Sequence, residues 1–264
     1  MERRDHAGMA RNEKVLNCSY PNPGAIFKLI CFPWAGGGSF HFAKWGQSMQ
    51  DFVEVYSIRL AGRESRLEEP IASDPDQVVD EIVCALLPVI QDKPFAFFGH
   101  SMGSYTAFLT AVQLKKEHKL EPIHLFLSSS FAPYEKNSRL AEYQQMSDEQ
   151  ASVFLTDIGG TPKNLTDNKE LFKQTISKMR ADGELFKKYI FDITTIWGIL
   201  TCDLTCFQGS DDTIIKDMKA WAKITSGNTD IHVLPGDHFY LMETSNENFI
   251  KNYITKSLEF SMFA

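Results

Sequence analysis

Apolar residues along the chain gather in short runs that are separated by amphipathic stretches. Six of these runs have the β-branched and aromatic content of strands. We expect strands at residues 27–33, 53–60, 94–100, 123–130, 203–209 and 230–236. The run "PFAFFGH" at 94–100 is continuously apolar, which is typical of a strand covered on both faces.

Between the strands, apolar positions recur at helical spacing. Residues 73–90 show this pattern, with Ser73 or Asp74 as the expected N-cap and Pro75 in the first turn. A second helix is expected from 101 to about 116, and short helices are expected between and after the last two strands. Strands that alternate with helices predict an α/β fold with a mainly parallel central sheet covered by helices.

The alternation breaks between residues 131 and 200, where the sequence predicts helices and loops without a clear strand. We interpret this segment as a helical lid insertion within one domain that spans residues 1–264. The alternative is a subdomain that takes no part in function.

Composition and charge exclude several classes of protein. The net charge is −7, the isoelectric point is near 5.5, and the lysines and arginines are scattered, so nucleic acid is not an expected partner. The polar N-terminal segment has no apolar core, so no secretory signal is expected. No window has an apolar run long enough to cross a membrane, so no transmembrane segment is expected either.

The five cysteines indicate a reducing compartment. Cys31, Cys84, Cys202 and Cys206 lie inside apolar runs, so we expect buried thiols of a cytosolic protein rather than disulfides. The Cys202 and Cys206 pair lacks the additional ligands of a zinc site, so we expect it to pack within a strand and to bind no metal.

The segment "FFGHSMGS" places Gly99, Ser101 and Gly103 in the pattern G-x-S-x-G, between an expected strand and an expected helix. A nucleophile elbow needs a strand-to-helix turn so sharp that side chains two residues before and after the serine would collide. Glycines at these two positions meet that requirement. We therefore interpret Ser101 as a nucleophile, and the alternative is a serine that caps an ordinary helix.

A serine nucleophile needs a base, and His238 is the candidate. It follows the last expected strand in "LPGDHFYL", which matches the chain order serine, acid, histidine of this type of elbow. The other histidines lie in the polar terminus, in a charged run, within strands, beside the glycine loop or in the elbow itself. They are His6, His118, His124, His232, His41 and His100.

The acid that orients this histidine should follow a strand between Ser101 and His238. The segment "CFQGSDDTI" offers Asp211 and Asp212 after a strand and a turn glycine. We favour Asp212 over Asp211, and Asp203 is a more remote candidate. Without Ser101 and His238, two solvated loop carboxylates would be the simpler interpretation.

Three consecutive glycines in "CFPWAGGGSF" indicate that something lies close to the backbone, because glycines cost conformational entropy without adding contacts. A dinucleotide fingerprint is the rival interpretation, but its third glycine would fall on His41. An oxyanion hole fits better, with N–H groups from Met102 and from Ala35. No cofactor is therefore expected.

Six segments together resemble the type II thioesterases of the α/β-hydrolase superfamily. They are "FPWAGGG" (32–38), "RLAGRESR" (59–66), "FFGHSMGS" (97–104), "GGTP" (159–162), "GSDD" (209–212) and "PGDHFYL" (235–241). The chain departs from the family pattern at Trp34, where a histidine is common, and at Ala61, where a proline is common.

The resemblance implies that the chain hydrolyses medium- to long-chain fatty acyl thioesters on the phosphopantetheine arm of the acyl carrier protein of fatty acid synthase. Bulky apolar residues of the lid suit either an acyl pocket or a plain core. They are Phe131, Met146, Phe154, Phe172, Met179 and Phe186. Basic pairs at 115–116 and 187–188 are candidates for docking the carrier protein. The alternatives are a carboxylesterase or lipase acting on oxygen esters, and a binding module without catalytic activity.

Overall fold

A seven-stranded sheet runs through the computed structural model, which describes residues 12–49, 51–135, 142–159, 168–187, 190–215 and 217–263. The strand order is β1-β3-β2-β4-β5-β6-β7, and every neighbouring pair is parallel except β1 with β3. The strands are β1 (Leu16–Asn17), β2 (Phe27–Phe32), β3 (Val53–Ile58), β4 (Phe95–His100), β5 (His124–Ser128), β6 (Asp203–Gly209) and β7 (Thr229–Leu234). The mainly parallel sheet expected from the sequence is confirmed.

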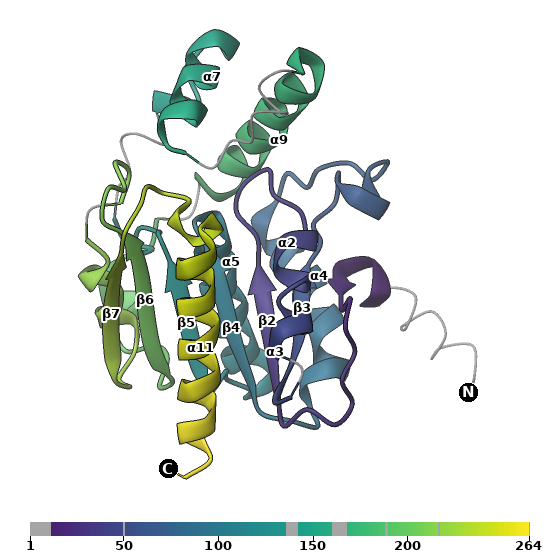
Figure 1. Cartoon of the computed structure of the whole chain (residues 1–264), viewed down its shortest axis with the longest axis vertical. Coiled ribbons are helices and arrows are strands. Elements are labelled where there is room, and N and C mark those ends of the chain that lie inside the picture. Colours follow the sequence, from purple (N-terminus) through teal and green to yellow (C-terminus); the bar gives the residue numbers. More distant parts are fainter. Residues whose placement is uncertain are drawn as a thin grey trace.

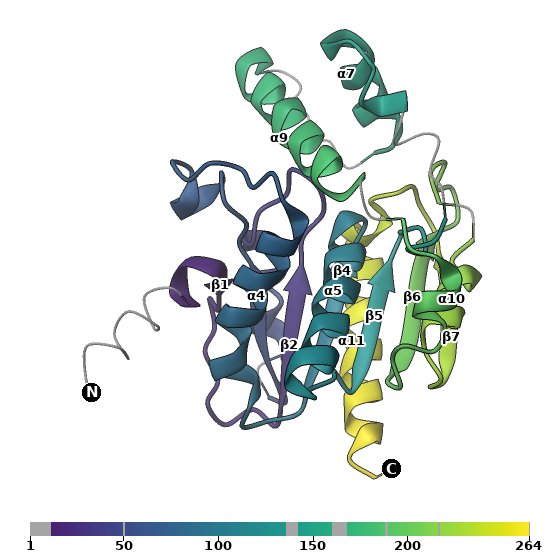
Figure 2. The same cartoon turned by 180° about the vertical axis from the view of Figure 1, so that it is seen from behind.

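Helices cover both faces of this sheet, as Figures 1 and 2 show from opposite sides. The α-helices are α2 (Phe40–Ala43), α3 (Gly46–Met49), α4 (Pro75–Ile90), α5 (Met102–Gln113), α7 (Asp148–Asp157), α9 (Lys169–Lys187), α10 (Ile193–Ile196) and α11 (Thr244–Ser261). Shorter helical turns are η1 (Glu64–Arg66), η2 (Leu114–His118), η3 (Lys219–Ile224) and η4 (Tyr240–Met242).

Two apolar cores lie on the two faces of the sheet. One core packs α4, α5 and η3 against the face seen in Figure 2, and it includes the fully buried Phe108 and Trp221. The other packs α2, α3 and α11 against the opposite face, around Trp45 and Phe98. Because both faces are covered, the central strands β2 and β4 are buried along their whole length, which explains their unbroken apolar sequence.

Helix α4 begins as its sequence predicts. The Asp74 side chain accepts the N–H of Asp76, and Pro75 occupies the first turn, where its missing N–H costs nothing. Its buried residues include the large apolar ones at helical spacing, which are Val78, Val79, Ile82, Val83, Leu86 and Ile90.

The parallel register brings the ends of distant strands to one edge. Phe32 of β2 pairs with Gly99 of β4, and His100 of β4 pairs with Ser128 of β5. Gly209 at the end of β6 pairs with Leu234 at the end of β7. The loops that follow these strands therefore meet at the carboxyl edge of the sheet, where α/β folds form their ligand sites.

The segment 131–200 contributes helices α7, α9 and α10, and among its described residues no strand is present. Helices α7 and α9 lie beyond the carboxyl edge of the sheet (Figure 1). They share a small third core, which contains Tyr143, Phe172 and Ile176 and also contacts Phe239 from the loop after β7. This core includes Met146, Phe154, Phe172 and Met179. Phe131 and Phe186 instead pack in the core that α4, α5 and η3 form with the sheet.

Several expectations need correction. Cys84 is exposed, because it lies on the solvent face of α4, while Cys31, Cys202 and Cys206 are buried. All five cysteines are free thiols. The short helices expected between and after the last two strands are present as η3 and η4, but the chain then continues into an 18-residue helix, α11, which buries Ile250, Ile254 and Leu258 at four-residue spacing.

The structure also adds elements that the sequence did not predict. Strand β1 and the helices α2 and α3 are too short, at two and four residues, to leave a recognisable periodic pattern. Among the described residues, no helix combines the length and apolar character needed to cross a membrane.

Helix α5 approaches β2 so closely that only glycine fits between them. A Cβ atom on Gly103 would lie 1.9 Å from the carbonyl oxygen of Phe32, which is backbone and cannot turn away. The start of α5 is thereby seated directly on the end of β2.

We expect Gly103→Ala to lower the free energy of unfolding by about 2 kcal/mol or more, because the added methyl group forces the helix away from the strand. Urea denaturation measures this loss. Gly24→Ala is the matched control, since a Cβ atom there would meet only the side chain of Asn22 at 3.4 Å. Equal stability losses in the two variants would contradict the proposed close approach.

Candidate active site

Ser101 lies at the sharp turn between β4 and α5. Its backbone angles are φ 55° and ψ −121°, a left-handed conformation that a non-glycine residue adopts only when its surroundings impose it. Its N–H donates to the carbonyl of Ser128 at 2.8 Å, and its own carbonyl accepts the N–H of Ser104 at 3.0 Å. The turn is thus held from both sides, and Ser101 remains partly exposed at the carboxyl edge.

Gly99 and Ser104 brace this turn from beneath. A Cβ atom on Gly99 would lie 2.4 Å from the carbonyl oxygen of Gly103, so a side chain there would block the turn. The Ser104 hydroxyl bonds to the carbonyl of Gly99 at 2.7 Å and also contacts the backbone of Ser128. The sequence expectation that glycines allow the sharp turn agrees with these contacts.

His238 lies in the loop after β7, and its ring nitrogens face two different partners. Nε2 is 3.1 Å from the Ser101 Oγ, and Nδ1 is 2.8 Å from the Asp212 Oδ2. The amide of Asn246 on α11 donates to the carbonyls of Pro235 and Tyr240 on either side of the histidine. The loop is therefore anchored, and His238 as a whole residue is 4% exposed.

Asp212 presents one carboxylate oxygen to the histidine and the other to the backbone. Its Oδ1 accepts the N–H groups of Ile214 at 2.8 Å and Ile215 at 2.9 Å. Burial raises the pKa of the carboxyl group, but hydrogen bonds from His238 and from these two N–H groups more than offset this and lower it overall. Asp212 is therefore ionised at neutral pH.

The two other candidate acids point elsewhere. Asp211 is exposed, and its carboxylate is within hydrogen-bond distance of the Ser210 hydroxyl. Asp203 lies at the opposite end of β6, where it accepts the N–H of Asn228. Of the three carboxylates that the sequence offered, Asp212 is the one that contacts His238.

The turn after β6 and the loop after β7 are fastened to each other by backbone contacts. Ser210 donates its N–H to the carbonyl of Leu234, and Asp211 donates its N–H to the carbonyl of Gly236, both at 2.8 Å. A Cβ atom on Gly209 would lie 2.2 Å from the carbonyl oxygen of Asp237. The backbone segments that carry Asp212 and His238 are thus positioned together.

The glycine loop lies beside the start of α5. A Cβ atom on Gly103 would lie 1.9 Å from the carbonyl oxygen of Phe32 and 2.7 Å from that of Pro33, the two residues that lead into the loop. Within the loop, Gly37 donates its N–H to the carbonyl of Trp34 at 2.9 Å. The N–H groups of Ala35 and Met102 have no acceptor among the residues that the structure describes, so both remain available to a ligand.

Trp34 joins the glycine loop to the elbow and to the histidine loop. Its ring packs edge-on against His100 at 5.9 Å and against Phe239 at 5.6 Å between centroids. His100 is fully buried, its Nδ1 contacts the Ser128 hydroxyl at 2.8 Å, and burial lowers its pKa well below the usual value. Its Nε2 has no hydrogen-bond partner among the described residues, so the ring does not bond to the Ser101 hydroxyl.

The remaining histidines contact other groups. His124 stacks on Phe126, His232 stacks on Phe207, and His41 lies 3.6 Å from the carboxylate of Glu247. His118 is near Glu117 in η2. His6 lies outside the described residues.

Sequence reasoning did not assign a role to two charged residues beside the glycine loop. Arg63 and Asp182 are 3% and 1% exposed, and Asp182 accepts the N–H of Gly36 at 2.7 Å. Their segments were visible as a charged run and as part of an amphipathic helix, which usually indicate solvated surfaces. The burial of both residues therefore had no sequence signal except their position within "RLAGRESR" and the insertion.

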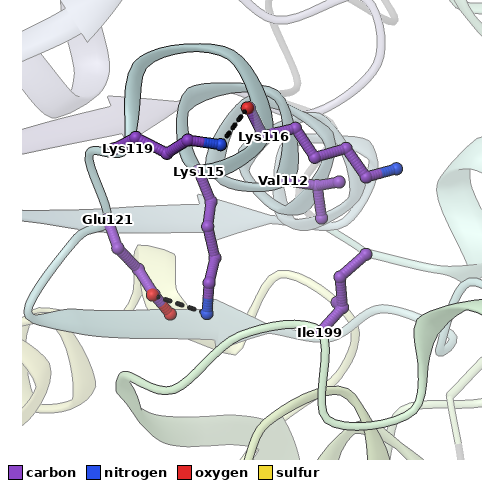
Figure 3. A pocket seen from close by; sticks show the side chains of 6 residues that line it. All are labelled: Val112, Lys115, Lys116, Lys119, Glu121 and Ile199. Atoms are coloured by element: carbon purple, nitrogen blue, oxygen red, sulfur yellow. Dashed lines mark hydrogen bonds and ion pairs between the residues drawn. The ribbon is translucent and has the colours of Figure 1, made fainter.

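Of the two basic pairs, the one at 115–116 lies far from this site. Helix α5 has twelve residues, hence a length of about 18 Å, and it leads from Ser101 to the opposite edge of the sheet. Lys115 pairs there with Glu121, in a pocket that Lys116 and Lys119 also line (Figure 3). In the other pair, Lys187 contacts Glu184, and residue 188 lies outside the described residues.

A serine hydroxyl, an imidazole and an ionised carboxylate in hydrogen-bond sequence form an arrangement suited to nucleophilic acyl transfer. Backbone N–H groups at the start of α5 face the same edge, where a helix N-terminus favours negative charge.

Comparison with known proteins also indicates acyl-transfer chemistry. The sequence model of the family described as "Thioesterase domain" matches residues 27–257. The S-acyl fatty acid synthase thioesterase, medium chain, of Rattus norvegicus is 55% identical over 262 residues, which cover 99% of each chain.

Solved structures agree in fold. The RedJ thioesterase from the prodiginine biosynthetic pathway of Streptomyces coelicolor matches with a TM-score of 0.82 at 28% identity, covering 91% of this chain and 94% of that chain. Human thioesterase 2 matches with a TM-score of 0.66 at 45% identity, covering 90% of this chain and 98% of that chain. The chain therefore belongs to the thioesterase family, has the α/β-hydrolase fold, and is a hydrolase of acyl thioesters.

Proposed function

We propose that this chain hydrolyses medium- to long-chain fatty acyl thioesters carried on the phosphopantetheine arm of an acyl carrier protein of fatty acid synthase. Ser101 acts as nucleophile, His238 as base and Asp212 as the acid that orients it. The observation that carries the proposal is the hydrogen-bond sequence from Asp212 through His238 to Ser101. The relative named S-acyl fatty acid synthase thioesterase, medium chain, supports the choice of substrate.

In the first half of the reaction, His238 Nε2 removes the hydroxyl proton as Ser101 Oγ attacks the thioester carbonyl carbon. The carbonyl oxygen becomes an oxyanion, which accepts hydrogen bonds from the N–H groups of Met102 and Ala35. The intermediate collapses, the C–S bond breaks, and the protonated His238 gives its proton to the departing pantetheine sulfur. Ser101 is left as an acyl ester.

In the second half, a water molecule takes the place of the thiol. His238 removes a proton from the water as its oxygen attacks the acyl-serine carbonyl, and the same N–H groups bind the second oxyanion. Collapse breaks the bond to Ser101 Oγ, which recovers its proton from His238. Ionised Asp212 stabilises the imidazolium in both halves and keeps Nδ1 as the donor.

We further propose that the insertion acts as a lid over the acyl chain. Its small core is rich in phenylalanine and methionine, whose side chains adapt to ligands of varied shape. That core reaches Phe239 and Ile214, the neighbours of His238 and Asp212. An acyl chain that enters from the site would therefore meet apolar side chains of the insertion.

The proposed setting is the cytosol, where thiols stay reduced, and the five free cysteines support it. For the acyl carrier protein, a docking surface near the carboxyl edge is required, because the thioester must reach Ser101. The pair Lys115 and Lys116 follows the C-terminal end of α5, at the opposite end of the strands, and is therefore set aside as a docking site.

A comparison of two substrates tests the proposed function. We expect decanoyl-pantetheine to be hydrolysed with a kcat/KM at least about tenfold above that of the matched oxygen ester, and acyl-carrier protein to be hydrolysed as well. Ser101→Ala should lower this kcat/KM by about 10³-fold or more, because the nucleophile is lost. The fold should be kept, because alanine fits the same turn. Preference for the oxygen ester would favour a carboxylesterase, and an active Ser101→Ala variant would exclude Ser101 as nucleophile.

A second prediction separates the two adjacent aspartates. Asp212→Asn should lower kcat by about 10⁴-fold, since the amide carries no charge and favours the wrong tautomer of His238. Asp211→Asn is the matched control and should stay within about tenfold of the unmodified protein, as suits a surface carboxylate. Steady-state kinetics and thermal unfolding of both variants measure the contrast. If kcat fell severely in Asp211→Asn but not in Asp212→Asn, Asp211 would be the acid that orients His238.

A further inference from the structure

A buried ion pair connects the insertion to the loop after β3. Arg63 Nη2 lies 2.8 Å from Asp182 Oδ1, and Arg63 Nη1 lies 3.0 Å from Asp182 Oδ2, so the guanidinium engages both carboxylate oxygens. The two side chains are 4% and 1% exposed. They come from segments 119 residues apart, of which one is helix α9 of the insertion.

Both members of this pair also hold the backbone of the glycine loop. Asp182 Oδ2 accepts the N–H of Gly36 at 2.7 Å, and Arg63 Nη1 donates to the carbonyl of Gly37 at 2.9 Å. One turn earlier on α9, Met179 packs so tightly that a Cβ atom on Gly36 would lie 2.5 Å from its Cγ. Helix α9 is therefore in direct contact with the loop that carries Ala35.

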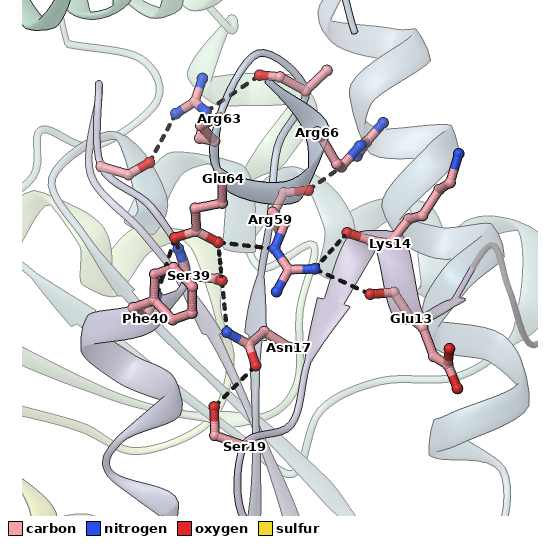
Figure 4. A network of polar contacts seen from close by, with 12 residues as sticks. Glu13, Lys14, Asn17, Ser19, Ser39, Phe40, Arg59, Arg63, Glu64 and Arg66 are labelled. Atoms are coloured by element: carbon pink, nitrogen blue, oxygen red, sulfur yellow. Dashed lines mark hydrogen bonds and ion pairs between the residues drawn. The ribbon is translucent and has the colours of Figure 1, made fainter. Parts of the chain in front are cut away.

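The far end of the glycine loop is held by a second charged residue of the same segment (Figure 4). Glu64 accepts the N–H groups of Ser39 at 2.6 Å and Phe40 at 3.3 Å, and Arg59 Nε donates to Glu64 at 2.8 Å. Glu64 adopts a left-handed backbone conformation with φ 53°. This end of the loop is fixed without help from the insertion, so only the Gly36 end depends on α9.

We propose that Asp182 and Arg63 are positioning residues that set the Ala35 N–H for the oxyanion and make its placement depend on the seating of helix α9. The inference rests on the function proposed above. The peptide unit of Gly36 and that of Ala35 share the Ala35 Cα atom, so fixing the Gly36 N–H limits how far the Ala35 N–H can turn. When α9 moves away from the sheet, the Gly36 N–H loses Asp182 as its acceptor. The neighbouring Ala35 N–H is then no longer held in the position that the oxyanion requires.

The chemistry of the contact suits this task. A carboxylate that accepts a backbone N–H forms a charge-assisted hydrogen bond, which is shorter and stronger than a neutral one. The buried carboxylate needs the Arg63 guanidinium as its counter-charge, because removing one partner leaves an uncompensated charge. The acceptor of Gly36 is thus present only when Arg63 and α9 are both in place.

The primary test is Asp182→Asn, which keeps the size of the side chain but turns an N–H₂ group toward the guanidinium. We expect kcat on decanoyl-pantetheine to fall at least about tenfold while KM changes less than about threefold, because a displaced donor affects the transition state more than the bound substrate. The affinity for octylboronic acid, which forms a tetrahedral adduct on serine, should fall by a similar factor.

Asp148→Asn is the matched control. Asp148 forms an ion pair with Arg180 at 2.8 Å within the same insertion, and among the described residues no hydrogen bond or ion pair joins it to the glycine loop. This variant should keep kcat within about twofold of the unmodified protein, as suits a partly exposed pair. A loss of kcat in Asp148→Asn that equals the loss in Asp182→Asn would overturn the proposal, since both would then report a general loosening of the insertion.

Two further measurements keep the proposal testable if Asp182→Asn does not fold. Arg63→Lys retains the counter-charge but not the two-pronged contact, and we expect kcat to fall at least about threefold, with boronate affinity falling in parallel. The amide proton of Gly36, observed by NMR, should shift and exchange faster in either variant. A smaller loss of kcat, unchanged boronate affinity or an unchanged Gly36 amide would each overturn the proposal.

These results are distinguishable from a failure of the proposed function. If Ser101→Ala remained active or decanoyl-pantetheine were not hydrolysed, the mechanism would be wrong. The Gly36 amide would still report whether Asp182 holds the loop, since that measurement requires no substrate.

Discussion

The close approach of helix α5 to strand β2 is the constraint on which the site depends. A side chain at Gly103 would collide with the carbonyl of Phe32, and a side chain at Gly99 would collide with the backbone at the start of α5. The chain can pass from strand to helix there only if Ser101 adopts a left-handed conformation, which costs about 1–3 kcal/mol. Burial of β2 and β4 on both faces offsets that cost, and the same turn lifts the hydroxyl toward His238.

Around this turn, the reactive groups are held by contacts between loops rather than by the sheet itself. The backbone contacts between the turn after β6 and the loop after β7 carry Asp212 and His238 as one unit. Trp34 packs between the glycine loop, the elbow and the histidine loop. The glycine loop in turn is held by Glu64 at one end and by Asp182 at the other. A displacement of any one loop therefore shifts the loops in contact with it.

Strands β2 to β7 and the serine, histidine and aspartate candidates could be predicted because each leaves a local signal. A strand buried on both faces is a run of apolar residues, and an elbow needs glycines two residues before and after Ser101. Asp212 could be favoured over its neighbour but not fixed, because the direction of adjacent loop side chains depends on contacts such as those with Ile214. The pairing of Arg63 with Asp182 left no such signal, since residues 119 apart meet only through the folded sheet.

The exposure of Cys84 determines where the molecule reacts with thiol reagents. Burial raises the pKa of Cys18 to about 11 and raises the pKa values of Cys31, Cys202 and Cys206 as well, so these four thiols form little thiolate at neutral pH. Cys84, on the outer face of α4, is the exposed one of the five. A maleimide dye would therefore attach mainly at one place, on a rigid helix away from the loops that carry Ser101 and His238. The natural sequence thus already contains a single attachment point for fluorescence measurements.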